Sequence, residues 1–254
     1  FHGNCGPGDD FVLPPVELLG PTQVGEVRID VPAGAVCKAG PSSILVADAA
    51  KLVKTGAGVW EAQDRLLAQV TRIELTDGTT KIVHGQQLTI SRRGELVIGE
   101  TATLDLNTVY GRSEGYALNE VTHGKKITLS GTIIDSAVAE GVDAYGGPLS
   151  HVCLGRDTAI GGETPTNSRI DCRPIAGSAE NTQLLEGPYT LTLPGGNVFC
   201  VINSSFELNR LDSHGYLLLE NTITGTITNG IHFFDGTTTR FNASKIPATI
   251  GFEV

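Results

Sequence analysis

Carboxylates are the first candidates for chemistry in this chain. Glycoside hydrolysis needs two carboxyl groups that flank the scissile bond of a sugar. The side chains that could supply such a pair are Asp135, Glu140, Asp143, Glu207 and Asp212, and the three aspartates are the first to test. Carboxylates are also ordinary on an acidic surface, and aromatic residues, on which sugar rings could stack, make up only 6% of the chain. We therefore assign no catalytic residue and keep a polysaccharide-active enzyme on a β-helix as a third hypothesis.

Other catalytic and metal-binding patterns are missing from the sequence. It has no Gly-x-Ser-x-Gly motif, which would place a serine nucleophile on a sharp turn. No two histidines are spaced by two or by four, as ligands on one face of a strand or a helix would be, and no Cys-x-x-Cys occurs. We predict neither a metal ion nor a cofactor.

Five cysteines, Cys5, Cys37, Cys153, Cys172 and Cys200, point to an oxidising compartment. The odd number leaves one thiol outside any intrachain bridge. Cys153 and Cys172 bracket a segment rich in Gly, Pro, Ser and Thr, and we predict a disulfide between them because it would restrict the unfolded chain. The second bridge stays open among Cys5, Cys37 and Cys200. Asn203-Ser204-Ser205 and Asn242-Ala243-Ser244 are sequons that would accept an N-linked glycan at Asn203 and Asn242 in a source that glycosylates.

Bulk composition narrows the class of protein. The 254 residues carry a formal net charge of −10 without a basic run, so nucleic acid and anionic membranes would repel the chain. No stretch of 18 apolar residues occurs, and we predict no transmembrane segment. The sequence has no methionine and begins at Phe1, which we interpret as a processed N-terminus. We predict a secreted or cell-surface protein.

Strand and turn signals dominate the pattern. Apolar and charged residues alternate from Glu26 to Val31, as in a half-buried strand. Asp77-Gly78 and the segment 194–197 predict hairpin turns, because Gly accepts a positive φ. Segments 43–54 and 60–67 are the helix candidates, and the pattern dissolves into a long loop between 138 and 187. These signals predict an all-β fold, an antiparallel sandwich or jelly roll with one or two short helices.

A parallel β-helix is the alternative fold. Residues 127–134 resemble residues 221–228, as coils of a solenoid would, but two copies fall short of a sustained repeat. We expect an extended arm over residues 1–24 and a β-rich body over 25–254. The body has a candidate seam between two sub-domains near 109–124.

The arm suggests a function. Its apolar residues surround two prolines, which exclude a central strand, so the arm could lie along the open sheet edge of another copy. Such head-to-tail contacts generate filaments. Our first hypothesis is a structural subunit of an extracellular filament, pilus or surface layer, and the second is a cell-surface carbohydrate-binding or adhesin module with its site in the 138–187 loop. The predicted donor residues are Phe11, Val12, Leu13, Val16, Leu18 and Leu19, and the predicted partners are copies of the chain, with glycans or a host surface as alternatives.

Overall fold

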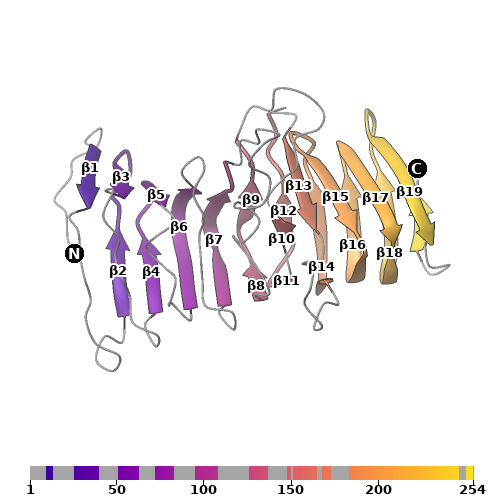
Figure 1. Cartoon of the computed structure of the whole chain (residues 1–254), viewed down its shortest axis with the longest axis horizontal. Helices are drawn as coiled ribbons and strands as arrows, with labels where there is room; N and C mark the ends of the chain where they lie inside the picture. Colours follow the sequence, from indigo (N-terminus) through magenta and orange to yellow (C-terminus); the bar gives the residue numbers. More distant parts are fainter. Residues whose placement is uncertain are drawn as a thin grey trace.

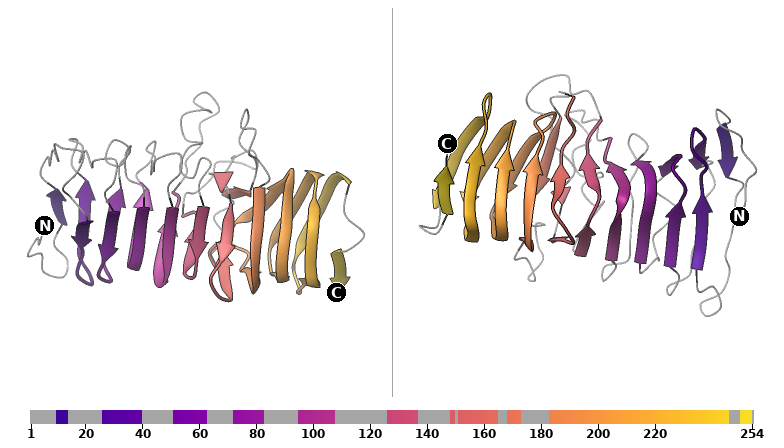
Figure 2. Two further views of the ribbon diagram at one scale, coloured as in Figure 1. Left: turned by 90° about the horizontal axis from the view of Figure 1, so that it is seen from below. Right: turned by 180° about the vertical axis from the view of Figure 1, so that it is seen from behind.

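The chain forms an elongated parallel β-solenoid, seen in the computed structural model in Figure 1. Its coils follow one another along the long axis from the N-terminal to the C-terminal end, as the views from below and from behind in Figure 2 also show. The structure describes residues 10–13, 26–39, 51–62, 72–82, 95–107, 126–136, 148–149, 151–164, 168–172, 183–245 and 250–253. Within these ranges no residue is helical, and therefore no helix there is long and apolar enough to cross a membrane.

Within these described ranges, twenty strands build two sheets, and their pairings are all parallel. The large sheet has 15 strands. Its strands are β1 (Asp10–Leu13), β2 (Glu26–Asp30), β3 (Val36–Ala39), β4 (Lys51–Thr55), β5 (Val59–Ala62), β6 (Arg72–Ile82), β7 (Glu95–Asp105), β8 (Lys126–Leu129), β9 (Thr132–Ile134), β11 (Val152–Leu154), β12 (Thr158–Ile160), β14 (Gln183–Leu193), β16 (Ser204–Ser213), β18 (Thr224–Phe233) and β20 (Ile250–Glu253). The small sheet has five: β10 (Pro148–Leu149), β13 (Arg169–Cys172), β15 (Val198–Ile202), β17 (Tyr216–Thr222) and β19 (Thr238–Lys245).

Successive coils differ in length. Residues 127, 152, 185, 206 and 225 occupy one register position, so the intervals between coils there are 25, 33, 21 and 19 residues. The long strands β7 and β14 cross the full width of the large sheet. Between them, each coil is split into two short strands, β8 and β9 or β11 and β12. Six strands, β7, β8, β11, β14, β12 and β9, therefore form a closed circuit of parallel pairings.

Stacked apolar side chains fill the solenoid. One inward row crosses seven strands of the large sheet, and each of its members is fully buried: Leu52, Ile73, Leu96, Ile127, Val152, Leu185 and Phe206. In the small sheet, Ile170, Phe199 and Leu217 form a second row that belongs to the same core. Burying each such side chain contributes roughly 1.5–3 kcal/mol, and the two rows hold neighbouring coils together.

The antiparallel sandwich is wrong, because the strands pair in parallel. Asp77-Gly78 does not reverse the chain: both residues lie inside β6, where Gly78 has a φ of 64° and the register with β7 shifts. A glycine with positive φ is equally suited to a β-bulge. Residues 194–197 do turn the chain, but they connect β14 of the large sheet to β15 of the small one and so form a corner. The parallel β-helix alternative is closer to the structure.

Both predicted helices are also wrong where they can be compared. Lys51–Lys54 belong to β4 and Trp60–Ala62 to β5, and the remainder of each segment lies outside the described residues. Their apolar residues point into the solenoid as strand residues: Leu52 and Trp60 are both fully buried. Short apolar runs fit either a strand or a helix, and here packing between coils decides.

Two segments singled out in the sequence have other places in the fold. The repeat between 127–134 and 221–228 is not a repeat of coils, since Ile127 shares its register position with Gly225 and not with Asn221. The candidate seam at 109–124 lies outside the described residues, and the large sheet continues from β7 to β8 on its far side. The 138–187 segment contains β10 to β13 and the start of β14, so its described part is a coil of the solenoid.

Candidate functional site: a polar groove across four strands

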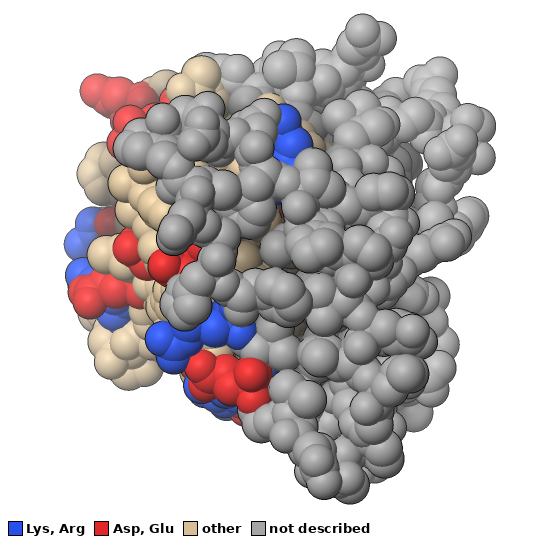
Figure 3. Space-filling view, turned by 90° about the vertical axis from the view of Figure 1, so that its left-hand side faces the viewer, with Lys and Arg blue, Asp and Glu red and all other residues tan. Residues whose placement is uncertain are grey.

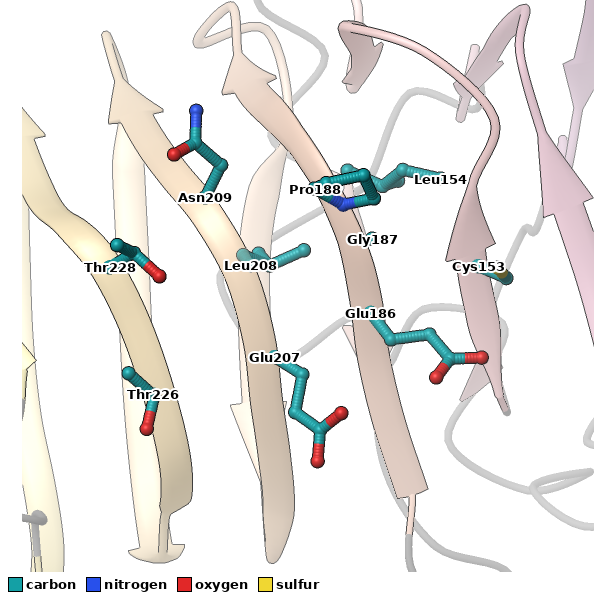
Figure 4. A pocket seen from close by; sticks show the side chains of 10 residues that line it. All are labelled: Cys153, Leu154, Glu186, Gly187, Pro188, Glu207, Leu208, Asn209, Thr226 and Thr228. Atoms are coloured by element: carbon teal, nitrogen blue, oxygen red, sulfur yellow. The ribbon is translucent and has the colours of Figure 1, made fainter.

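An open groove of about 750 Å³ crosses the outer face of the large sheet (Figure 4). Four neighbouring strands form its floor, β11, β14, β16 and β18. The lining residues are Cys153, Leu154, Glu186, Gly187, Pro188, Glu207, Leu208, Asn209, Thr226 and Thr228. Two carboxylates, one carboxamide and two hydroxyls are thus available for hydrogen bonds to a ligand.

Irregular strand pairing accounts for the position of the groove. The register shifts between Gly187 and Thr190, and shifts again at the same level on the next two pairs, β16 with β18 and β18 with β20. Bulges bend a strand, so three of them in line bend the sheet at this level. Gly187 has a φ of 136°, and a Cβ there would lie 2.9 Å from the carbonyl oxygen of Leu154, so a glycine allows β14 to approach β11.

One outward row supplies the chemistry of the groove. Cys153, Glu186, Glu207 and Thr226 occupy the same register position on the four strands. Neighbouring strands lie about 4.8 Å apart, so the two glutamates are adjacent. In Figure 4 the carboxylate of Glu186 is turned towards Cys153, whereas Glu207 extends from the next strand. Among the described residues, the side chain of Glu207 makes no hydrogen bond or ion pair.

Glu186 is held by two neighbours on the coil before it. Nε2 of His151 lies 2.6 Å from Oε1 of Glu186. Burial, together with the negative charge of Glu186, raises the pKa of the Cys153 thiol. A raised pKa keeps the thiol protonated at neutral pH, whereas a cysteine nucleophile needs a thiolate. His151, Cys153 and Glu186 therefore do not form an activated cysteine site.

The groove also fits hydrolysis poorly. A general acid needs a carboxyl group that keeps its proton, which usually requires an apolar pocket. Glu186 instead accepts a contact from His151, and Glu207 is exposed. Over the described ranges, no three His, Cys, Asp or Glu side chains are grouped so that they could hold a metal ion. The arrangement is suited to binding hydroxyl groups.

Asp135 and Asp212, the two described aspartates among those proposed for catalysis, do not line this groove. Asp135 is only 1% exposed and lies at a corner where the side chain of Asn197 donates to its backbone carbonyl at 2.9 Å. Asp212 lies on β16 and accepts a hydrogen bond from Nε of Arg210 at 2.5 Å. Asp143 and Glu140 lie outside the described residues. Of the three described carboxylates considered in the sequence, Asp135, Glu207 and Asp212, Glu207 alone is part of the groove.

The structure does not contain the predicted Cys153–Cys172 disulfide. Both residues are free thiols, one on the outer face of the large sheet and the other buried in β13 of the small sheet. Burial raises the pKa of Cys172 to about 12 and also raises that of Cys200, to which Nη2 of Arg169 donates at 3.1 Å. Cys37 is buried in β3, and no disulfide joins it to Cys200; Cys5 lies outside the described residues.

The front of the predicted arm pairs within its own chain. Phe11, Val12 and Leu13 belong to β1, which runs parallel to β3 in register with Cys37, Lys38 and Ala39. Val16, Leu18 and Leu19 lie outside the described residues. Docking of the arm on a second copy therefore stays a prediction, and its first three apolar residues already form a rung of the large sheet.

Charges of both signs lie side by side on the outer face of the N-terminal coils. Lys51 contacts Glu74 at 2.7 Å and Glu26 at 3.5 Å, and Arg72 contacts Glu74 at 2.7 Å and also Glu95. Figure 3, which looks onto the N-terminal end, shows blue and red side chains next to one another in the described part of this surface. Because the signs are mixed there, this face does not favour a polyanion such as nucleic acid.

Sequence reasoning missed Glu186, although a signal was present. Glu186 precedes Gly187-Pro188, and a Gly-Pro pair inside a β-prone run marks an interrupted strand. Bulges are frequent next to functional sites, so the residue before this pair was a candidate.

No protein-family model matches the chain, and neither a curated protein nor a solved structure is significantly similar to it.

Proposed function

We propose that this chain is a secreted or cell-surface solenoid that binds an extended, hydroxyl-rich glycan in the groove across β11, β14, β16 and β18. One observation carries the proposal. Polar side chains from three neighbouring strands, β14, β16 and β18, line a single open groove that extends over β11, and the strand spacing repeats them at regular intervals over roughly 10 Å. A glycan likewise presents hydroxyl groups at regular intervals along its length.

The composition of the groove argues for this class of ligand. Sites for compact small molecules are mostly apolar and enclosed. Here the groove is open, and Glu207, Thr226 and Thr228 are exposed hydrogen-bonding residues on its floor. Carboxylates and hydroxyls together can accept and donate to many sugar hydroxyls at once.

Charge limits which glycans fit. Among the described residues no Lys or Arg lines the groove, while Glu186 and Glu207 do, and the chain as a whole has a net charge of −10. Polyanions such as sulfated glycans and polyuronates would be repelled. The ligand is therefore a glycan without acidic groups.

The test is calorimetric titration of the purified chain with neutral and with acidic oligosaccharides. The variant Asn209→Ala/Thr228→Ala removes two hydrogen-bonding side chains of the groove, and Thr101→Ala, an exposed threonine on β7 outside it, is the matched control. We expect binding of a neutral glycan that weakens at least tenfold in the double variant and is unchanged in the control. Binding that is equal in all three proteins, or absent for the whole neutral panel, would contradict the proposal.

Self-assembly is the second candidate function, and the position of β1 favours it. In the described residues β1 pairs with β3 alone, so it is a terminal strand of the large sheet. The other edge of a terminal strand can pair with a strand of a second copy. In this version of strand addition the arm remains on its own body and presents an edge.

Deletion of residues 1–20 tests this assembly. The truncated chain keeps the coils from β2 onwards, and we expect it to stay folded by circular dichroism while losing any filaments that the full chain forms in electron micrographs. If the truncated protein assembles as the full chain does, the arm is not the assembly element.

A further inference from the structure

Asn203 occupies an exposed corner of the solenoid. It is the single residue between β15 and β16, where the chain passes from the small sheet to the large one. Its φ is 47°, in the left-handed region that Asn tolerates better than most residues. The side chain is exposed on the protein surface.

A hydrogen bond holds the oxygen of the Asn203 side-chain amide and leaves its nitrogen available. The backbone N–H of Thr222, on the next coil, donates to Oδ1 of Asn203 at 3.3 Å, and the N–H of Asn203 donates to the carbonyl of Glu220 at 3.3 Å. Nδ2, at the other end of the same amide, makes no hydrogen bond within the described part of the chain. A group attached to Nδ2 would leave both contacts in place.

The second sequon has a different environment. Asn242 lies inside β19, where it is in register with Glu220 of β17, so its backbone belongs to a continuous strand. N-linked glycans are bulky and are typical of surface turns and loops. Asn203 meets this condition, and it is followed at the required spacing by Ser205.

We propose that Asn203 is the N-glycan acceptor of this chain and that Asn242 is not. In the reaction, Nδ2 attacks the anomeric carbon of a lipid-pyrophosphate-linked oligosaccharide. The bond from that carbon to the pyrophosphate breaks, the lipid pyrophosphate leaves with the bonding electrons, and the nitrogen loses one proton. The inference does not depend on glycan binding in the groove, and either can fail without the other.

The test is expression of the whole chain behind a signal peptide in a glycosylating eukaryotic cell, followed by analysis of the translocated protein. We expect one glycan, removable by a glycan-releasing amidase and assigned to residue 203 by mass spectrometry. It should be lost in Asn203→Gln and Ser205→Ala and kept in Asn242→Gln. Because Ser205→Ala leaves the corner asparagine in place, it remains informative if Asn203→Gln fails to fold. Translocated protein without a glycan, or a glycan that persists in Ser205→Ala, would overturn the assignment.

Discussion

Glu186 on β14 and Glu207 on β16 are direct neighbours in the parallel register, and both line the groove. Like charges on adjacent strands destabilise a sheet. Nε2 of His151 contacts the carboxylate of Glu186 at 2.6 Å, whereas the side chain of Glu207 is left without an ion pair among the described residues. A ligand that donates hydroxyl groups to both carboxylates would relieve this repulsion.

Replacing Glu207 by Gln should stabilise the empty protein. The change removes the repulsion from Glu186, and we expect the free energy of unfolding to rise by about 0.5 kcal/mol. Urea denaturation at low ionic strength measures it, and the gain should shrink in 1 M salt. Glu163→Gln, an exposed glutamate outside the groove, is the control and should change little. A loss of stability in Glu207→Gln would contradict this reading of the pair.

Lys54 is a buried side chain that joins backbone carbonyls at a corner of the solenoid by hydrogen bonds. Its side chain is fully buried, and Nζ donates to the backbone carbonyls of Gly56 at 2.5 Å, Gly58 at 2.8 Å and Asp77 at 2.5 Å. Lys54→Met keeps most of the side-chain volume and leaves three carbonyls without this donor. We expect a loss of about 3 kcal/mol in the free energy of unfolding, measured by denaturant titration at pH 7. A change below 0.5 kcal/mol, the range of an ordinary surface substitution, would show that the corner does not need the ammonium group.

The same lysine predicts a pH dependence at alkaline pH. Burial lowers the pKa of Lys54 to about 8 from its usual value of 10.5, despite the nearby carboxylates of Asp77 and Asp30. Between pH 8 and pH 10.5 the unfolded chain binds more protons than the folded chain, because Lys54 keeps its proton longer in the unfolded chain. The contribution of Lys54 to the free energy of unfolding therefore rises with pH over this range. The stability of wild type minus that of Lys54→Met should therefore increase from pH 8 to pH 10.5. A difference that stays constant or falls over this window would mean that the three carbonyls keep the pKa high.

Asn197 is the centre of a buried polar network that joins three coils. Its Nδ2 donates to the hydroxyl of Ser168 at 2.7 Å and to the carbonyl of Asp135 at 2.9 Å, and its Oδ1 accepts from the N–H of Gly162 at 3.0 Å. Asn197→Ala removes all three of these hydrogen bonds and leaves Ser168 Oγ its donation to the carbonyl of Asp135 at 3.1 Å, and we expect a loss of roughly 2–4 kcal/mol. Asn229→Ala removes one exposed hydrogen bond to Asn209 and should cost less than about 0.5 kcal/mol. Equal losses in the two variants would contradict the role given to the network.

Strand content could be predicted from the sequence because it depends on local alternation. Glu26–Asp30 is β2 as expected, with Ile29 buried and Arg28 exposed. Whether the strands pair in parallel or antiparallel could not be predicted from the sequence. Gly78 and the residues 194–197 have the same local preferences whether they form hairpins, bulges or corners. Coils of 19 to 33 residues also remove the fixed period by which a solenoid is usually detected. The groove depends on register between residues far apart in sequence, such as Cys153 and Glu186, which no local pattern determines.

The ion pairs that Glu74 makes with Lys51 and Arg72 on the N-terminal coils predict that the stability of the protein falls in acid. Burial raises the pKa of Glu74, but hydrogen bonds from Lys51 and Arg72 outweigh this and hold the pKa below its usual value. The stabilisation is present above the unfolded pKa, near 4.5, and is lost as the pH falls through the lower folded value. We expect Glu74→Gln to cost about 1 kcal/mol or less at pH 7 and to differ progressively less from wild type below pH 4. Thermal melts from pH 3 to pH 7 measure this, and a cost that grows in acid would contradict it.

Cys153 provides a probe of the groove itself. It is half-buried with a raised pKa, whereas Cys172 and Cys200 are fully buried. We therefore expect a thiol reagent to modify Cys153 slowly at pH 7, faster as the pH rises, and well before Cys172 or Cys200 in the native protein. Peptide mapping by mass spectrometry separates the individual cysteines, including Cys5. Modification of Cys172 or Cys200 at the rate of Cys153 would show that the small sheet opens.

The most direct test of glycan binding is the rate of Cys153 modification with and without a saturating neutral oligosaccharide. A ligand lying across β11, β14, β16 and β18 covers this thiol, and the account predicts at least a fivefold slower reaction, with full speed restored in Asn209→Ala/Thr228→Ala. A rate at Cys153 that does not change, with any neutral glycan at any concentration tested, would contradict the assignment of the groove as the binding site.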